Sequence, residues 1–95
     1  MYKERVIAAV VPAHNEAAHI RDVISGLPAS VDFIVIVDDK SSDDTASLAE
    51  TSGDARVHVI RHEHNTGVGG AIITGHKRAL ELGSDVNVIF AGDDQ

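Results

Sequence analysis

Several residue types are scarce in this chain of 95 residues, and each absence excludes a class of protein. There is no cysteine, so neither a disulfide framework nor thiolate chemistry is available. Lysine and arginine number 8 against 15 aspartates and glutamates, and the net charge of −7 argues against a nucleic-acid partner. No apolar run approaches the roughly 20 residues of a membrane helix, and no signal peptide opens the chain. We therefore expect a cytoplasmic protein.

Short apolar runs alternate with helical patterns along the chain. Strands are predicted at 5–11, 31–37, 56–61 and 87–91. Helices are predicted over 43–51 and 71–82, and around residues 20–27, where apolar residues recur at helical spacing. Pro12 is expected to end the first strand, because proline cannot donate to a ladder. The alternation predicts an α/β fold, a parallel sheet of order 3-2-1-4 with right-handed crossovers and helices on both faces.

Polar clusters follow three of these predicted strands: Asn15 with Glu16, Asp38 with Asp39, and Asp93 with Asp94. Open parallel sheets bind ligands beyond the carboxyl ends of their strands, at the point where the strand order reverses. Here that point lies between the first and fourth strands, so residues 12–16, Asp39 and Asp93 should surround one crevice. Carboxylates there can hold a divalent cation against phosphates or accept hydrogen bonds from a base or ribose.

Other polar residues near these strand ends have simpler interpretations. Asn15 is a candidate cap for the next helix, and Ser42 with Asp43 and Asp44 indicates a helix start with a capping hydroxyl. Residues 65–70 form a predicted glycine-rich loop, which permits close backbone approach and precedes a helix N-terminus able to bind an anion. Both a binding role and a plain loop role stay open for His14. His62 and His64 are interpreted as solvated loop residues rather than metal ligands.

Together, four motifs resemble those of inverting family 2 glycosyltransferases of the GT-A fold. Residues 11–16 (VPAHNE) resemble V-P-x-x-N-E, and residues 37–45 (VDDKSSDDT) resemble V-D-D-G-S-x-D-x-T, with Lys40 in place of glycine. Residues 65–75 resemble N-x-G-x-x-x-A-x-x-x-G, and residues 91–95 (AGDDQ) resemble D-x-D-G-Q, with Ala91 in place of the first acid. The chain is also similar to the branch that contains dolichyl-phosphate mannose synthases and related polyprenyl-phosphate sugar transferases.

The resemblance implies a Rossmann-like half of the GT-A fold and a set of roles for individual residues. Residues 1–95 would be the N-terminal nucleotide-sugar-binding part of a transferase domain, cut at the metal motif, with the catalytic base beyond Gln95. The cofactor would be Mg²⁺ or Mn²⁺ on Asp93 and Asp94, the donor a UDP- or GDP-sugar, and polyprenyl phosphate a candidate acceptor. The parent enzyme would then be membrane-associated. The nucleotide-binding residues would be Pro12, Ala13, His14, Glu16, Asp38, Asp39, Gly67 and Gly69.

Two other functions compete with this one. The acidic pair after an apolar strand also resembles a phosphoacceptor receiver domain, although there the pair should follow the first strand. A sugar nucleotidylyltransferase is the second alternative, but its glycine-rich loop should follow the first strand too. Finally, a sheet cut off after its fourth strand would leave an edge uncovered, and we expect self-association through that edge.

Overall fold

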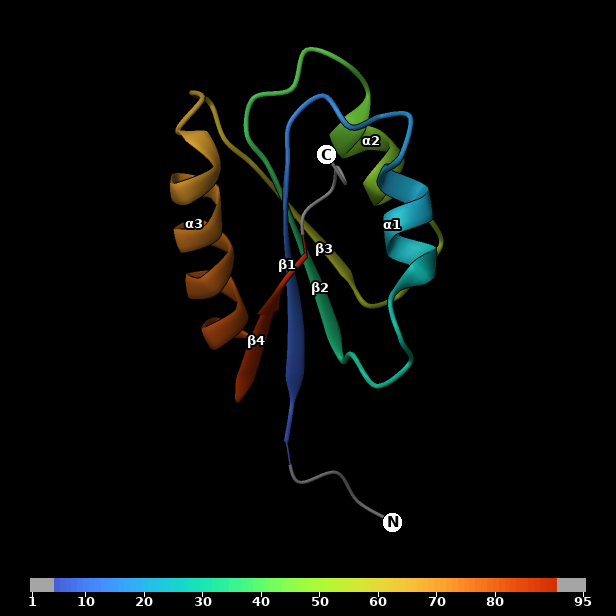
Figure 1. The fold of residues 1–95 in the computed structure, drawn as a ribbon, viewed down its shortest axis with the longest axis vertical. Coiled ribbons are helices and arrows are strands. Elements are labelled where there is room, and N and C mark those ends of the chain that lie inside the picture. Colours follow the sequence, from blue (N-terminus) through green and yellow to red (C-terminus); the bar gives the residue numbers. More distant parts are fainter. Residues whose placement is uncertain (1–4, 91–95) are drawn as a thin grey trace.

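The computed structural model describes residues 5–90, which form alternating strands and helices around one sheet (Figure 1). The elements are β1 (Ile7–Ala13), α1 (Ile20–Gly26), β2 (Phe33–Asp38), α2 (Thr45–Glu50), β3 (Val57–Arg61), α3 (Gly67–Glu81) and β4 (Val86–Ile89). All strand pairs are parallel, and the order is β3-β2-β1-β4. The predicted α/β class, strand order and parallel pairing are therefore confirmed.

The sheet is covered on both faces, as predicted: α3 lies on one side, and α1 with α2 lies on the other (Figure 1). Alternate residues of β1 and β2 point to opposite faces, so each strand contributes to two cores. One core joins Ala9, Val11, Ile34 and Ile36 to Ile20 and Ile24 of α1. The other joins Ala8, Val10, Val35 and Val37 to Ala71 and Ala79 of α3. Burial on both faces explains why these two strands are continuously apolar.

Helix α3 approaches the sheet closely at Gly75. A Cβ atom at this position would lie 2.3 Å from Val10 Cγ1 and 3.1 Å from Val37 Cγ2. Both contacts are shorter than side chains normally tolerate, and both partners are stiff, fully buried valines. The absence of a side chain at Gly75 therefore sets how near α3 packs against β1 and β2.

The prediction that Pro12 ends the first strand is wrong. Strand β1 continues through Pro12, which lies opposite Val37, to Ala13 opposite Asp38. Main-chain groups alternate sides along a strand, and Val10 O accepts from Phe90 N on the β4 side. Pro12 faces that same side, while Ala13 O accepts from Asp39 N at 2.8 Å on the β2 side. The missing proline donor therefore costs the β1–β2 ladder no hydrogen bond.

The helix starts also differ from the predictions. Helix α3 begins at Gly67, so most of the predicted glycine-rich loop is the first turn of a helix. Gly67 has φ +82°, a conformation that favours glycine. Helix α2 begins at Thr45 rather than at residue 43, and its N-cap, Asp44, makes no capping hydrogen bond with its side chain.

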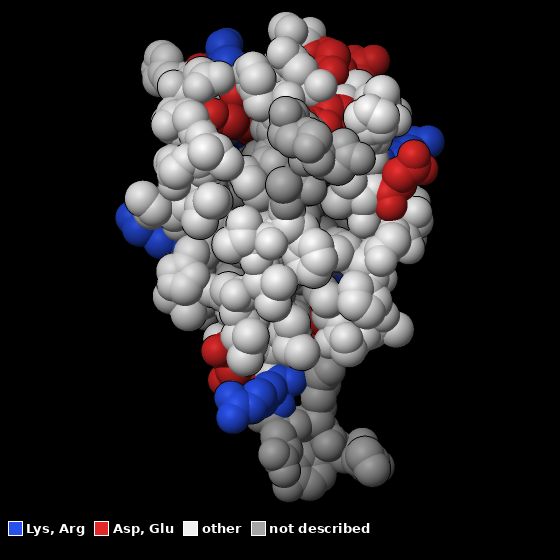
Figure 2. All heavy atoms as spheres, in the orientation of Figure 1, with Lys and Arg blue, Asp and Glu red and all other residues white. Residues whose placement is uncertain are grey.

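Strand β4 forms one border of the sheet that the structure describes. Figure 1 views the sheet from this border, and Figure 2 shows the same face with its charged side chains mainly at the two ends and the flanks. Val88 and Ile89 are 38% and 44% exposed. Within residues 5–90, no helix is long and apolar enough to cross a membrane.

Candidate functional site

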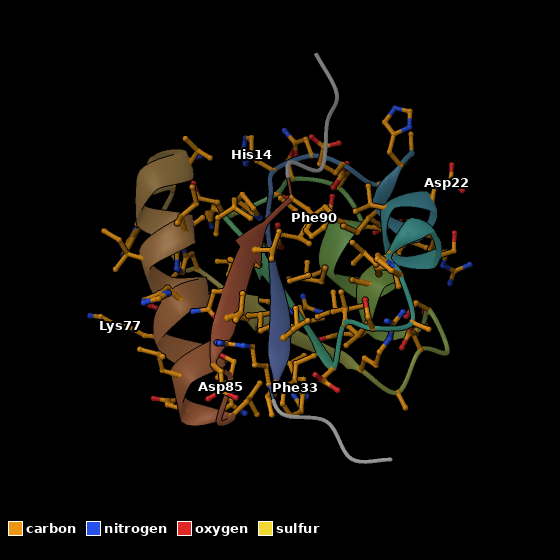
Figure 3. The ribbon with its side chains drawn as sticks, turned by 60° about the horizontal axis from the view of Figure 1, so that its bottom comes forward. His14, Asp22, Phe33, Lys77, Asp85 and Phe90 are labelled. Carbon is orange, nitrogen blue, oxygen red and sulfur yellow. The ribbon has the colours of Figure 1, made fainter. Side chains whose placement is uncertain are left out.

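The loops that follow β1, β2 and β3 meet at one edge of the sheet. Asp39 N donates to Ala13 O at 2.8 Å, which joins the ends of β1 and β2, and His62 N donates to Asp38 O at 2.9 Å, which joins the ends of β2 and β3. Figure 3 places His14, after β1, and Phe90, after β4, at this same edge. The edge contains the predicted switch point, because β1 and β4 are neighbours there.

The first two loops are tied together by side chains of the segment 41–45, which we call the loop clamp. Asn15 N donates to Ser41 Oγ at 2.8 Å, and Ser42 N donates to Asn15 Oδ1 at 2.8 Å. Glu16 N donates to Thr45 Oγ1 at 2.8 Å, and Thr45 is fully buried. Asn15 and Ser42 were predicted to cap helices; instead, they bind one another across the two loops.

Asp43 completes the loop clamp. Its carboxylate accepts from Thr45 N at 3.0 Å, from the Thr45 hydroxyl and, across the loops, from Ala17 N at 3.2 Å. The hydrogen bond from the Thr45 side chain lowers the pKa of Asp43 against the opposing effect of burial, and the two backbone donors lower it further. Asp43 is therefore an ionised acceptor that fixes the β1–α1 loop, in addition to preceding a helix.

Asp39 is buried beneath the start of α3. Only 4% of the residue is exposed, and its Oδ1 accepts from Thr66 N at 2.8 Å, from Thr66 Oγ1 at 3.0 Å and from His62 Nδ1 at 2.9 Å. Its Oδ2 accepts from Gly67 N at 2.8 Å. Burial alone would raise the pKa of Asp39, but these hydrogen bonds outweigh it and lower the pKa to about 2.

The anion at the N-terminus of α3 is thus the Asp39 carboxylate of the same chain. This differs from the prediction of a helix N-terminus open to a ligand. Two acceptor sites are available on each carboxylate oxygen, and Oδ2 receives one hydrogen bond from the described residues, so one of its acceptor sites is not used by them. Asp38, 7% exposed, uses its Oδ1 to accept from Ser41 N at 3.2 Å and from the Ser41 hydroxyl.

His14 is exposed at this edge and has a defined tautomer. Its Nδ1 lies 2.9 Å from the carbonyl oxygen of Asp39, which can only accept, so Nδ1 carries a proton. Its Nε2 then accepts from Asn15 Nδ2 at 3.4 Å. The imidazole ring therefore ties the first loop to the Asp39 carbonyl while one side of it stays open to a ligand.

Sequence reasoning missed the role of His62 and Thr66. The His62 side chain is 14% exposed, and its two ring nitrogens bind Asp39 Oδ1 and, at 2.9 Å, Thr74 Oγ1. The interpretation of His62 as a solvated loop residue is wrong. A signal was present, because His62 follows β3 as Asp39 follows β2, and the carboxyl ends of neighbouring parallel strands share an edge.

The structure brings most of the predicted nucleotide-binding residues together at this edge. The end of β1 and the loop after it contain Pro12, Ala13, His14 and Glu16. The end of β2 and the loop after it contribute Asp38 and Asp39, and Gly67, at the start of α3, donates to the Asp39 carboxylate. Gly69 lies in the first turn of α3. The predicted metal residues Asp93 and Asp94, and Ala91 beside them, lie outside the described residues. Within 5–90 there is no group of three histidine or carboxylate side chains that could hold a metal ion.

A groove lies elsewhere on the molecule, between α1 and the turn that follows α2. Its lining includes Arg21, Asp22 and Ser25 of α1 and Gly53 and Asp54 of the turn. These residues lie along α1 and after the end of α2, so the groove is separate from the loops at the strand ends. None of the predicted site residues lines it.

Comparisons with known proteins agree with the fold and the motifs. Residues 8–94 match the family model described as glycosyl transferase family 2. A UDP-N-acetylglucosamine–dolichyl-phosphate N-acetylglucosaminyltransferase of Methanococcus voltae is 37% identical over 97% of this chain and 43% of its own length. An undecaprenyl-phosphate mannosyltransferase of Micrococcus luteus is 33% identical over 92% of this chain and 37% of its own length. The chain thus spans about two fifths of the length of these curated relatives.

Among solved structures, glucosyl-3-phosphoglycerate synthase of Mycobacterium tuberculosis is similar. Its complex with Mn²⁺, UDP and glucosyl-3-phosphoglycerate aligns with a TM-score of 0.73 and 31% identity, over 95% of this chain and 34% of that one. Its complex with Mn²⁺, UDP-glucose and phosphoglyceric acid aligns with the same TM-score and identity. Nearly the whole of this chain therefore aligns with about a third of each of these structures.

Proposed function

The chain belongs to glycosyl transferase family 2, and from this membership we propose that the edge formed by the loops after β1 and β2 binds the nucleotide of a sugar nucleotide for glycosyl transfer. The observation that carries the proposal is the position of the predicted nucleotide-binding residues. They come from separate segments of the sequence, and all but Gly69 lie at the ends of β1 and β2, in the loops that follow these strands, or at the first residue of α3. Hydrogen bonds join these segments beside the β1–β4 switch point.

The chemistry of this edge suits a nucleoside. Asp39 Oδ2 offers a hydrogen-bond acceptor, and the exposed His14 ring offers an aromatic surface. The half-buried Pro12 adds an apolar surface. A UDP-sugar is the donor best supported, since the M. voltae relative is named for UDP-N-acetylglucosamine and the M. tuberculosis neighbour is crystallised with UDP and UDP-glucose. GDP-sugars remain the alternative donor.

A divalent cation belongs to the proposal, with Asp93 and Asp94 as its ligands. The described carboxylates fit this role poorly, because Asp38 and Asp39 already accept hydrogen bonds from the protein. Asp93 and Asp94 come shortly after β4 in the sequence, and Mn²⁺ is present in the neighbouring enzyme's complexes. The cation would hold the diphosphate and stabilise the charge that develops on it.

The proposed acceptor class carries a phosphate. Both relatives are named for polyprenyl phosphates, and the structural neighbour is crystallised with phosphoglyceric acid. With a polyprenyl phosphate, an anionic phosphate oxygen would form a bond to the anomeric carbon. The bond from that carbon to the diphosphate would break with its electron pair, releasing the nucleoside diphosphate. A lipid acceptor would place the whole enzyme at a membrane surface on its cytoplasmic side.

The receiver interpretation fits the structure poorly. Receiver-type doubly wound sheets have the order 2-1-3-4-5, whereas the order here is β3-β2-β1-β4. The Asp39 carboxylate also accepts four hydrogen bonds from the protein, which makes it a poor nucleophile toward a phosphoryl donor. The family match further favours a glycosyltransferase over a nucleotidylyltransferase.

Calorimetric titration with UDP, GDP and acetyl phosphate, each with Mn²⁺ and with EDTA, tests this function. We expect UDP to bind, to bind more tightly with Mn²⁺, and to lose that gain in Asp93→Ala. Asp22→Ala is the matched control, because Asp22 is an exposed carboxylate on α1 (Figure 3). Binding of acetyl phosphate but of neither nucleotide would contradict the proposal.

A further inference from the structure

Lys40 has an unusual backbone conformation at the candidate site. Its φ is +62°, and among residues 5–90 the only other residue besides glycine with positive φ is Asn15, at +57°. Asparagine adopts this left-handed region comparatively often, whereas a long side chain such as lysine pays a steric cost there. Glycine would pay none. The conformation therefore gives no structural reason for a lysine.

The backbone on both sides of Lys40 is held by other residues. The Asp39 carbonyl accepts from His14 Nδ1 at 2.9 Å and from Asn65 Nδ2 at 3.4 Å. On the other side, Ser41 N donates to Asp38 Oδ1 at 3.2 Å. The loop clamp then fixes the segment that follows. The left-handed turn is thus set by its surroundings, and the Lys40 side chain takes no part in it.

The Lys40 ammonium is available to a ligand. The residue is exposed, and it forms no hydrogen bond or ion pair with residues 5–90, although it adjoins Asp38 and Asp39. By contrast, Arg56 and Arg61 each pair with a carboxylate. An ammonium group has three donors and no acceptor, so its ligand must supply oxygen or nitrogen lone pairs.

We propose, on the basis of the proposed function, that Lys40 donates a hydrogen bond to a carbonyl oxygen of the nucleobase. Lys40 follows β2, whereas the candidate metal ligands Asp93 and Asp94 follow β4, and β1 lies between these two strands. A nucleotide whose diphosphate lies at the β4 end of this edge has its base toward β2. Uracil and guanine both carry carbonyl oxygens that can accept from an ammonium group.

Calorimetry with UMP and UDP tests this inference on Lys40→Gln, with Lys77→Gln as the control. Lys77 is an exposed lysine on α3 that points away from the sheet (Figure 3), and its substitution removes the same charge. We expect Lys40→Gln to weaken the binding of both nucleotides by the same factor, roughly ten- to a hundredfold. Lys77→Gln should bind as the parent does, and Lys40→Arg should retain most of the affinity.

Lys40→Gly separates binding from folding. It should lose affinity as Lys40→Gln does, with a melting temperature at or above that of the parent, because glycine relieves the steric cost. A lower melting temperature would overturn the inference in favour of a structural role. A loss confined to UDP, or abolished by salt, would indicate a phosphate contact and overturn it as well. If the parent binds UDP and Lys40→Gln binds equally well, only this inference fails; if the parent binds neither nucleotide, the proposed function fails with it.

Discussion

The Asp39→Asn substitution tests the most heavily hydrogen-bonded group at the candidate site. Asp39 accepts four hydrogen bonds, from His62 Nδ1, Thr66 N, Thr66 Oγ1 and Gly67 N, and these fix the start of α3. Asparagine keeps the shape of the side chain but removes the charge and presents an NH₂ group to donors. The stability of α3 and of the loop before it should therefore decrease.

The pKa of Asp39 gives the magnitude. A decrease from 3.8 to about 2 in the folded protein corresponds to about 2 kcal/mol of folding free energy. For a domain of this size, such a loss lowers the melting temperature by roughly 10 °C. Because the folded-state pKa is the lower one, the stabilisation is complete above pH 4–5 and is lost as the pH falls toward 2. At pH 3, about half of it remains.

Urea denaturation at pH 7 and pH 3, followed by circular dichroism, measures this loss. We expect Asp39→Asn to be less stable than the parent at pH 7, and the difference to shrink by about half at pH 3. Asp44→Asn is the control, since Asp44 belongs to the same motif but is exposed and caps no helix with its side chain. Equal stabilities at pH 7, or a deficit independent of pH, would refute the assigned role of Asp39.

Three further predictions concern packing, the loop clamp and assembly. Gly75→Ala should destabilise the fold by about 1–3 kcal/mol in urea denaturation, because its Cβ would overlap Val10. Gly69→Ala is the control: its Cβ would meet no atom within 4 Å, and the substitution should stabilise the fold by about 0.5–1 kcal/mol. Equal effects of the two substitutions would contradict this packing. Thr45→Val should lower the free energy of unfolding by about 1–3 kcal/mol, because it removes the hydroxyl that accepts from Glu16 N, and Thr45→Ser should lower it less. The reverse order would contradict the role of the loop clamp. We also predict that light scattering will detect self-association through β4 that Ile89→Lys weakens, and a clean monomer at high concentration would count against it.

The topology could be predicted because the apolar pattern of the sequence indicates directly which residues are buried. Strands β1 and β2 are apolar at every position that faces either core, and the spacing of Ile20, Ile24 and Leu27 marks the buried face of α1. Short crossovers between parallel strands then leave few strand orders. These signals are local, and tertiary contacts reinforced rather than changed them.

The differences arose where a side chain from another element decides the local structure. Helix α3 begins earlier than its sequence indicates because Asp39, from the end of β2, binds the N–H groups of Thr66 and Gly67. Pro12 stays within β1 because its missing donor faces away from β2, a fact that depends on register. The motif acids were expected to face a ligand, yet Asp43 and most of the Asp39 carboxylate bind the protein itself.

The location of the nucleotide is the central claim, and amide chemical-shift mapping tests it most directly. The ¹⁵N-labelled protein would be titrated with UDP in the presence of Mg²⁺, which avoids the paramagnetism of Mn²⁺. The predicted result is that the largest shifts occur at His14, Glu16 and Lys40, in the loops after β1 and β2. Largest shifts at residues 52–55, in the groove beside α1, would contradict the account.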